Sequence, residues 1–258
     1  MNVDAAHGTW VLDLDGVVWL SDQPIPGSAE AVGRLRAAGI RVVFATNNSS
    51  PTVGQLLERL SAAGVAAEPA DLVTSAQAAA SMLEPGDTAV VCAGAGVIEA
   101  LAQRGVRVLE EGPANAVVVG WTREFDFDRL ATAASAVRSG ARLIGTNDDA
   151  TYPTPSGLLP GGGAILAAVA TASQSEPDVA GKPHAPLVSL IRERVKEISL
   201  VVGDRPSTDG RLAQRLSSRF GLVRSGVTSA GTGPMAVEPD EDASDLRSLV
   251  EIVLGSAL

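Results

Sequence analysis

Short apolar runs alternate with amphipathic segments along the whole 258-residue chain. The runs are β-branched and bounded by turn residues, as buried strands are, and the segments between them space apolar residues as helices do. The predicted strands are Thr9–Leu14, Ile40–Ala45, Thr88–Cys92, Val106–Leu109, Ala116–Gly120, Arg142–Gly145, Ile198–Val202 and Phe220–Val223. The predicted helices are Gly27–Ala38, Pro51–Ala63, Gly96–Arg104, Phe127–Arg138, Gly162–Ala172, His184–Val195, Thr208–Ser217 and Asp245–Leu254. This alternation predicts an α/β fold with a mostly parallel sheet and helices on its faces.

The same pattern predicts two units. A new α/β series begins near Ala76, and the last third of the chain returns to the style of the first. Between them, Gln174–Val179 is polar, contains Pro177, and is interpreted as a connection back. We therefore predict a discontinuous domain, residues 1–75 plus 179–258, built on a Rossmann-like doubly wound parallel sheet. A smaller α/β domain, residues 76–178, would be inserted between its halves.

The first strand ends in an unusual way, because TWVLDLDGVVWL (residues 9–20) places Asp13 and Asp15 directly after a buried apolar run. Residues two apart in an extended segment point to the same side. Two like charges that close require a cation or a shared proton. Gly16 then allows a sharp turn at the strand end. The pattern predicts a metal-assisted acid pair at the tip of a central strand, where ligands bind in open α/β sheets.

Further polar clusters come after other strands or turns. Thr46, Asn47 and Asn48 come after the second strand, Lys182 lies in a Gly-Lys-Pro turn, and Asp204 and Asp209 come after the strand Ile198–Val202. Since the carboxyl ends of parallel strands share one edge of the sheet, these groups can converge there. Carboxylates suit a hard cation such as Mg²⁺, and lysine and threonine can bind phosphate oxygens.

Each cluster also has a plainer structural interpretation. Asp13 and Asp15 could be solvated acids in a turn, and Lys182 could be a surface lysine. Thr46 could cap the next helix, a role compatible with phosphate binding. Asp209 could be a first-turn acid favoured by the helix dipole. The ordered occurrence of all the clusters favours the functional interpretation over these separate ones.

Composition narrows the partners and the compartment. The net charge is 20 − 30 = −10, which disfavours nucleic acid as a partner. Cys92 is the only cysteine, so an internal disulfide and a thiolate zinc cluster are excluded, and a cytoplasmic location is expected. The first ten residues lack the basic and apolar regions of a signal peptide. The longest apolar run, Ala164–Ala172, is too short to span a bilayer, so no membrane partner is expected.

Four motifs in order, DLDGV, TNN, GKP and GDRxxTD, resemble those of the haloacid dehalogenase (HAD) superfamily of phosphatases. The large insert between the second and third motifs resembles the class IIA cap of 4-nitrophenylphosphatase, phosphoglycolate phosphatase and NagD-like enzymes. This resemblance covers essentially the whole chain. It implies hydrolysis of a phosphomonoester with Mg²⁺ as cofactor, and an insert that covers the catalytic edge. It also makes a homodimer through the insert an expectation.

The resemblance implies roles for individual residues. Asp13 resembles the nucleophile that forms an aspartyl-phosphate, and Asp15 the general acid and then base. Lys182 resembles the lysine that neutralises the nucleophile and the phosphoryl group. The TNN motif, with Thr46, Asn47 and Asn48, resembles the phosphate-holding motif. The implied metal site consists of Asp13, the backbone carbonyl of Asp15, Asp204 and Asp209, the last of which would orient metal-bound water.

The insert departs from the family pattern at two places. Asp148 stands in TNDD where relatives usually read TNPD, and Arg123 follows Gly120-Trp121-Thr122 where many relatives carry an acid. Both departures bear on the substrate rather than on the chemistry. Arg123, Asn147 and Asp149 are the candidate specificity residues.

The expected reaction is hydrolysis of a small phosphorylated metabolite. Candidate substrates are glycerol 3-phosphate, 2-phosphoglycolate, and sugar or nucleoside monophosphates, with 4-nitrophenyl phosphate as an artificial substrate. One alternative is a HAD-type phosphotransferase with an acceptor other than water. Another, from a different class, is a non-enzymatic phospho-accepting switch of the receiver type, although such modules are shorter and have no insert.

Overall fold

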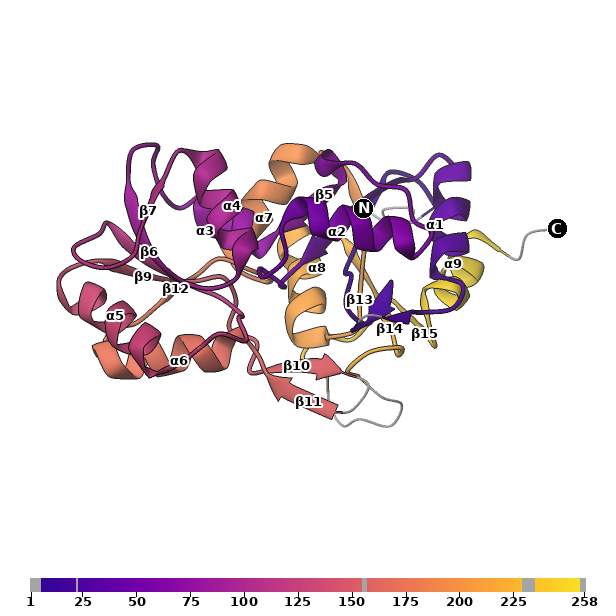
Figure 1. Cartoon of the computed structure of the whole chain (residues 1–258). Coiled ribbons are helices and arrows are strands. Elements are labelled where there is room, and N and C mark those ends of the chain that lie inside the picture. The colour runs from indigo at the N-terminus through magenta and orange to yellow at the C-terminus, as the bar shows by residue number, and fades with distance from the viewer. Residues whose placement is uncertain (1–5, 22, 155–156, 229–234, 256–258) are drawn as a thin grey trace.

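The chain folds around two parallel sheets, as the computed structural model shows (Figure 1). The structure describes residues 6–21, 23–154, 157–228 and 235–255. The larger sheet has six strands in the order β15-β14-β13-β1-β4-β5, and the smaller has five in the order β12-β9-β8-β6-β7. All neighbouring strands in both sheets run parallel. The predicted α/β class with mostly parallel sheets is confirmed.

The strands of the six-stranded sheet are β1 (Thr9–Leu12), β4 (Arg41–Thr46), β5 (Leu72–Thr74), β13 (Ile198–Gly203), β14 (Arg219–Val223) and β15 (Glu241–Ala243). Those of the five-stranded sheet are β6 (Thr88–Cys92), β7 (Arg107–Leu109), β8 (Ala116–Val119), β9 (Arg142–Gly145) and β12 (Asp178–Val179). Two antiparallel hairpins pair β2 (Trp19–Leu20) with β3 (Gln23–Pro24), and β10 (Thr151–Thr154) with β11 (Gly157–Pro160). The helices are α1 (Ser28–Ala37), α2 (Val53–Ala62), α3 (Ser75–Ala80), α4 (Ala95–Arg104), α5 (Phe127–Arg138), α6 (Gly162–Ser173), α7 (Ala185–Arg194), α8 (Arg211–Leu216) and α9 (Leu246–Leu254).

Helices cover both faces of the six-stranded sheet, which makes it doubly wound. Trp10 and Leu12 of β1 pack in one buried cluster with apolar residues of α1, α2 and α9. Val11, between them, points to the opposite face and packs in a second cluster with residues of α7 and α8. The alternation follows from the two-residue period of a strand, and burial on both faces explains why β1 is apolar from Trp10 to Leu12.

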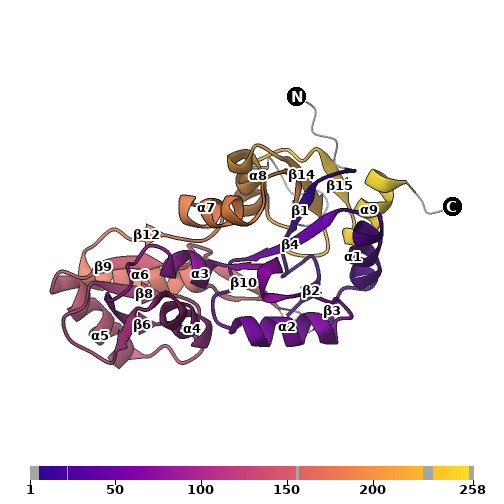
Figure 2. The same ribbon diagram turned by 90° about the horizontal axis from the view of Figure 1, so that it is seen from above.

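The five-stranded sheet is also covered on both faces. Val117 and Val119 of β8 pack with α5 and α6, whereas Val118 packs on the side of α3 and α4. That second cluster continues into the six-stranded sheet and includes Val11 and Val43, so one apolar core extends from one sheet to the other. Seen from above, α3 and β10 lie between the two sheets (Figure 2).

Local sequence explains why several elements begin and end where they do. Thr52 precedes α2, and its side chain and that of Gln55 exchange hydrogen bonds with each other's backbone N–H groups. This reciprocal capping satisfies two N–H groups that would otherwise lack partners. Asp126 and Asp245 cap α5 and α9 in the same general way, each accepting from a backbone N–H group three residues on.

Some elements differ from the prediction. Gln174–Val179 is not only a connection, because Asp178–Val179 forms edge strand β12 beside β9. The predicted helix Thr208–Ser217 instead begins with a wide π-type turn at Pro206–Gly210 and becomes α-helical only from Arg211. Short strands such as β5 and β15, and both hairpins, were not predicted.

The predicted division into residues 1–75 plus 179–258 and an insert of residues 76–178 stays a prediction. Its two boundaries fall inside α3 and inside β12. Within the described part of the chain, none of the helices combines the length and the apolar character that crossing a membrane requires.

Candidate active site

The candidate site lies where the central strands of the six-stranded sheet end. Asp13 directly follows β1, Thr46 is the last residue of β4, and Asp204 directly follows β13. Because β4, β1 and β13 are adjacent and parallel, their carboxyl ends lie at one edge of the sheet. The topology therefore brings together groups that are up to 191 residues apart in the sequence.

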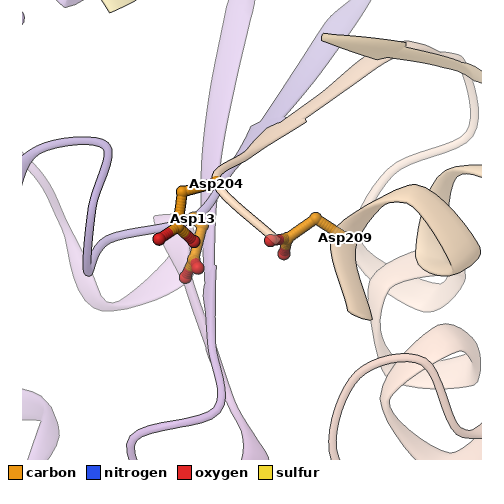
Figure 3. A group of neighbouring side chains, drawn as sticks. All are labelled: Asp13, Asp204 and Asp209. Atoms are coloured by element: carbon orange, nitrogen blue, oxygen red, sulfur yellow. The ribbon is translucent and has the colours of Figure 1, made fainter. Parts of the chain in front are cut away.

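Three carboxylates form a compact cluster at this edge. One oxygen from each of Asp13, Asp204 and Asp209 lies within 4.8 Å of the others. Figure 3 shows the three side chains turned toward one another, Asp13 and Asp204 from strand ends and Asp209 from the turn before α8. Asp209 and Asp204 are buried, and the Asp13 side chain is 12% exposed. Such a group is costly to bury unless positive charge accompanies it.

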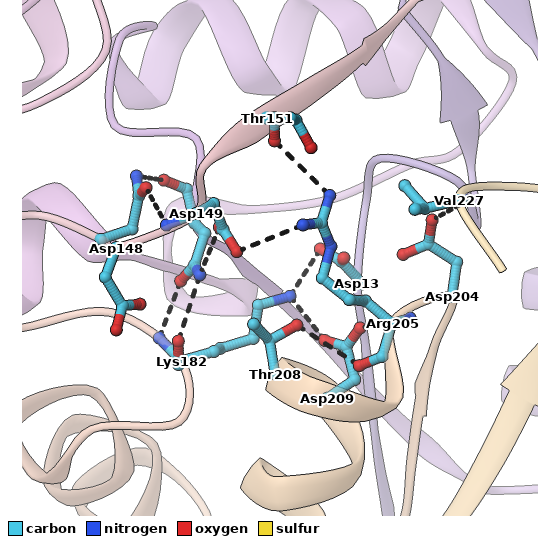
Figure 4. Close-up of polar contacts among 12 residues, drawn as sticks. Asp13, Asp148, Asp149, Thr151, Lys182, Asp204, Arg205, Thr208, Asp209 and Val227 are labelled. Atoms are coloured by element: carbon cyan, nitrogen blue, oxygen red, sulfur yellow. Dashed lines mark hydrogen bonds and ion pairs between the residues drawn. The ribbon is translucent and has the colours of Figure 1, made fainter. Parts of the chain in front are cut away.

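Lys182 supplies part of that charge. Its Nζ lies 2.8 Å from Oδ1 of Asp13 and 2.8 Å from Oδ1 of Asp209, and its side chain is only 2% exposed (Figure 4). Burial opposes the charged form, but Asp13 and Asp209 raise the pKa of Lys182 above its ordinary value. The lysine is therefore a buried, charged ammonium fixed between two carboxylates.

The positive charge of Lys182 alone does not balance the negative charge of the three carboxylates. Burial raises the pKa of Asp13 well above its ordinary range, with Lys182 opposing that shift and Asp209 adding to it. Burial, with Asp209 as the next cause, also raises the pKa of Asp204 to about 7. Ionised, the three acids and the lysine sum to −3 + 1 = −2. One divalent cation would balance this charge, and oxygen donors suit Mg²⁺. The donor set therefore fits the magnesium ion that the sequence implies.

Hydrogen bonds hold each acid in place. Oδ1 of Asp13 accepts from the backbone N–H of Leu14 at 2.7 Å, and Oδ2 of Asp204 accepts from that of Val227 at 2.6 Å. Oδ2 of Asp209 accepts from the backbone N–H of Arg205 at 3.1 Å. Both oxygens of Asp209 are thus engaged, one by Arg205 and one by Lys182, which leaves Asp13 and Asp204 as the freer donors to an ion.

Asp15 lies beside this cluster but in a different environment. Its Oδ1 accepts from Trp19 Nε1 at 3.2 Å and from the hydroxyl of Tyr152 at 3.0 Å. Burial raises the pKa of Asp15, while Arg59 and these hydrogen bonds oppose the shift. Arg59 itself stacks on the Trp19 ring, 4.4 Å from the ring centre. A partly buried acid with a raised pKa is suited to donate a proton near neutral pH.

The TNN segment connects the strand edge to Lys182 and to the smaller sheet. Oδ1 of Asn47 accepts from the backbone N–H of Lys182 at 2.7 Å, and its Nδ2 donates to Asp149 at 2.8 Å. Oγ1 of Thr46 accepts from the backbone N–H of Asn48 at 3.0 Å. Thr46 therefore does not cap α2; that role belongs to Thr52. Asn47 fixes the loop that carries Lys182.

A turn at Gly16 makes room for the acids. Gly16 has φ of +84°, a conformation that side chains disfavour. A Cβ built there would lie 2.5 Å from Oδ2 of Asp204. The predicted sharp turn is confirmed, and its glycine is required both by the backbone and by the closeness of Asp204.

Side chains from both sheets enclose a hollow of about 60 Å³ at the cluster. All the site residues predicted in the larger unit except Asp209 line it, and Asn147 and Asp149 line it from the smaller-sheet side. Asn147 uses its amide locally, donating to the backbone of Asn47 at 2.8 Å. Arg123 does not reach this hollow; it is exposed and lines a neighbouring one of about 980 Å³.

Six side chains of this hollow were not predicted from the sequence: Trp121, Thr151, Tyr152, Arg205, Thr208 and Val227. Arg205 belongs to the GDRxxTD motif, but the motif alone indicated no role for it. Its guanidinium lies 3.7 Å from Asp149 and 3.5 Å from the backbone oxygen of Thr151 (Figure 4). Trp121 and Tyr152 carry no local signal, because their placement depends on how the two sheets pack.

The described geometry agrees with comparisons to known proteins. A family profile described as haloacid dehalogenase-like hydrolase matches residues 10–107, and one described as HAD-hydrolase-like matches residues 179–249. D-glycerol 3-phosphate phosphatase of Mycobacterium tuberculosis is 38% identical over 254 residues, which cover 94% of this chain and 71% of the relative. The chain belongs to the haloacid dehalogenase-like hydrolase family. The predicted family is thereby confirmed.

Two further proteins are similar to this chain along most of its length. Acid sugar phosphatase of Staphylococcus aureus is 32% identical over 209 residues, covering 79% of this chain and 81% of the relative. The p-nitrophenyl phosphatase of Archaeoglobus fulgidus has a TM-score of 0.87 at 28% identity, covering 95% of this chain and 98% of that one. The magnesium complex of the M. tuberculosis glycerol phosphate phosphatase has a TM-score of 0.86 at 34% identity, with 96% and 78% covered.

Proposed function

We propose that this HAD-family chain hydrolyses phosphomonoesters of small metabolites with Mg²⁺ as cofactor. Polyol and sugar phosphates are the favoured substrates, since two relatives that match most of this chain are named glycerol 3-phosphate and acid sugar phosphatases. The observation that carries the proposal is Lys182, buried between Asp13 and Asp209 at 2.8 Å from each, beside Asp204. A phosphoryl group requires this combination of a carboxylate nucleophile and nearby positive charge.

In this proposal Asp13 is the nucleophile. Lys182 and the backbone of Leu14 hold its Oδ1, which orients the carboxylate and leaves Oδ2 without a donor among the described residues. Attack on phosphorus forms an aspartyl-phosphate while the ester P–O bond breaks. Thr46 and Asn48, which line the same hollow, would bind the non-reacting phosphate oxygens.

Asp15 acts as acid and then as base. Protonated, it gives its proton to the leaving oxygen; ionised, it then accepts a proton from the water that hydrolyses the aspartyl-phosphate. Asp13 and Asp204, with the backbone oxygen of Asp15 and Asp209 behind them, would hold the magnesium ion. That ion, when bound, supplies charge that offsets repulsion between the carboxylate and the phosphate.

The test is phosphate release from a panel that includes glycerol 3-phosphate, hexose phosphates, 2-phosphoglycolate and 4-nitrophenyl phosphate. We expect Mg²⁺-dependent turnover that a chelator stops. Asp13→Asn should lower turnover by at least about 10³-fold while the protein still folds, because the nucleophile is lost. Asp178→Asn, at an exposed ion pair with Arg142, is the matched carboxylate control and should retain turnover.

Product analysis distinguishes the alternatives. Transfer of phosphate to an added alcohol in preference to water would indicate a phosphotransferase. A phosphorylated Asp13 that persists for minutes, with no release of phosphate, would indicate a receiver-type switch. Full activity in Asp13→Asn would contradict the assignment of the nucleophile.

A further inference from the structure

Two donors from distant parts of the chain share one oxygen of Asp15. Trp19 follows the acid by four residues, whereas Tyr152 is 137 residues away on β10. Both donate to Oδ1, and Oδ2 accepts no hydrogen bond from the described residues. Trp19, which is close to Asp15 in the sequence, supplies one of these hydrogen bonds. The other comes from Tyr152 in the hairpin β10–β11.

The hairpin is fixed on both sides, so Tyr152 reaches Asp15 in a defined orientation. On one side, the Tyr152 ring lies 5.3 Å from the Trp121 ring, and Trp121 Nε1 donates to the backbone oxygen of Pro160 at 3.0 Å. On the other side, Arg205 lies 3.5 Å from the backbone oxygen of Thr151. These contacts tie β10 to the smaller sheet and to the strand edge that carries the acids.

The two donors determine which oxygen of Asp15 can carry the acidic proton. An oxygen that accepts from both an indole N–H and a phenol O–H has its lone pairs occupied, so the proton of the neutral acid belongs on Oδ2. A proton-transfer group works best when its proton already points at the accepting atom.

We propose that Tyr152 is a positioning residue that holds Oδ1 of Asp15 and thereby directs the proton on Oδ2 to the leaving-group oxygen. The inference rests on the proposed function, because it requires Asp15 to be the acid. As the ester P–O bond breaks, its electron pair goes to the leaving oxygen, which takes the proton from Oδ2. Asp15 is left as a carboxylate that still accepts from Tyr152.

Tyr152 also lies at the boundary between two hollows. It lines both the 60 Å³ hollow at the acids and the adjoining 980 Å³ hollow, together with Trp121 and Asn48. The smaller hollow contains the groups proposed to bind the phosphoryl group, so the remainder of an ester would extend toward the larger one. The leaving oxygen then lies at the boundary, next to Asp15 and Tyr152.

This role predicts a dependence on the leaving group. Phenyl phosphate and 4-nitrophenyl phosphate are similar in size, but phenolate is a much poorer leaving group than 4-nitrophenolate and depends more on a proton. Loss of the Tyr152 hydroxyl should therefore damage turnover of the first ester selectively. The kcat/KM value isolates this effect, because it reports the steps up to transfer of phosphate to Asp13.

The experiment measures kcat/KM for both esters with the Mg²⁺-loaded wild type, Tyr152→Phe and Leu159→Ala. Tyr152→Phe keeps the ring and removes only the hydroxyl. We expect about a tenfold loss with phenyl phosphate and less than about a twofold loss with 4-nitrophenyl phosphate. A tenfold loss is a part of the roughly 10²–10⁴-fold that general acid catalysis contributes, as a positioning role requires. Leu159 pairs with Tyr152 across the hairpin, so Leu159→Ala tests general loosening and should lower both values by the same factor.

The outcomes separate the two proposals. Wild-type protein that releases phosphate from neither ester and from no metabolite of the panel would refute the proposed function. Active wild-type protein with a Tyr152→Phe variant that loses the same factor on both esters, or loses nothing on either, would refute the role of Tyr152. An unchanged unfolding temperature in Tyr152→Phe excludes misfolding as the cause of a selective loss.

Discussion

At the scale of single residues, the candidate site consists of ionisable groups that stabilise one another only as a set. Lys182 is charged because Asp13 and Asp209 accompany it, and Asp204 has a raised pKa because it is buried near Asp209. Each group alone would be costly at its position. With all three acids ionised the set carries an excess of two negative charges, which is the electrostatic reason to expect a divalent cation.

The raised pKa of Asp204 predicts how pH affects the stability of the metal-free protein. Between about pH 4 and pH 7 the folded protein binds a proton at Asp204 that the unfolded chain has lost. The free energy of unfolding should therefore fall as pH rises through this window, by up to about 1.4 kcal/mol per unit. Below the window both states are protonated, and above it the penalty is constant.

Denaturant unfolding of metal-free protein at several pH values measures this slope. Asp204→Asn is the matched variant, because its amide stays neutral at every pH, and its slope should be smaller than that of the wild type. Identical slopes in the two proteins would show that Asp204 does not take up the proton. Added Mg²⁺ should stabilise the wild type more at about pH 7.5 than at about pH 5.5, since it requires the ionised carboxylate.

At the scale of elements, strand ends and the turns after them position the chemistry. β1, β4 and β13 are ordinary buried strands, and their apolar residues were sufficient to predict them. The turn after each strand is specific to this site: Gly16 turns the chain away, and the π-type turn at Pro206–Gly210 directs Asp209 back toward Lys182. Such turns are frequently found at functional sites.

Gly16→Ala should remove activity as well as stability. Alanine at φ of +84° costs about 1–2 kcal/mol, and its Cβ would displace the Asp204 carboxylate 2.5 Å away. Gly39→Ala is the matched control, because Gly39 has φ of +80° but no atom near its added Cβ. Both variants should lose stability in denaturant unfolding, Gly16→Ala more because of the displaced carboxylate, and only Gly16→Ala should lose phosphatase activity and Mg²⁺ binding. Equal activity in the two variants would contradict the proposed dependence on Asp204.

At the scale of the whole molecule, the two sheets share one apolar core and one hollow. The loop after β4 makes polar contacts that join them. Ser49 and Thr146 share a hydrogen bond of 2.9 Å, and the N–H of Gly96 donates to the backbone oxygen of Ser50 at 2.8 Å. The position of this loop, and hence of Asn47 and Lys182, therefore depends on the smaller sheet.

Gly96→Ala tests that dependence. A Cβ at Gly96 would lie 2.1 Å from the backbone oxygen of Pro51, so the smaller unit or the loop has to move. We expect a loss of about 1–3 kcal/mol in unfolding free energy and about a tenfold loss in kcat/KM. Gly33→Ala in α1 has open space around its Cβ and should be stabilising with unchanged kinetics. A Gly96→Ala variant with wild-type kcat/KM would show that the loop is positioned independently of the smaller sheet.

The sequence predicted helices and strands correctly where the pattern of apolar and polar residues repeats over several positions. Helix Phe127–Arg138 and strands Thr88–Cys92 and Arg142–Gly145 were predicted with the bounds that the structure has. Strand β12 was missed because two residues are too few to show a period. The π-type turn was missed because its extra backbone residue leaves no pattern in the sequence. Arg123, a predicted specificity residue, lines the neighbouring hollow rather than the one at the acids, and its role stays a prediction; Tyr152 was overlooked. The predicted homodimer and the domain boundaries stay predictions.

The sequence by itself determined the α/β class, the strands that form the centre of the larger sheet, and the acids, threonine and lysine at their ends. These features are local, since apolar period and residue type can be read within a short stretch of chain. Only the tertiary structure decided that Lys182 lies between Asp13 and Asp209, and that Tyr152 reaches Asp15 from a hairpin 137 residues away. Contacts of this kind depend on how one sheet packs against another, and no local pattern encodes that packing.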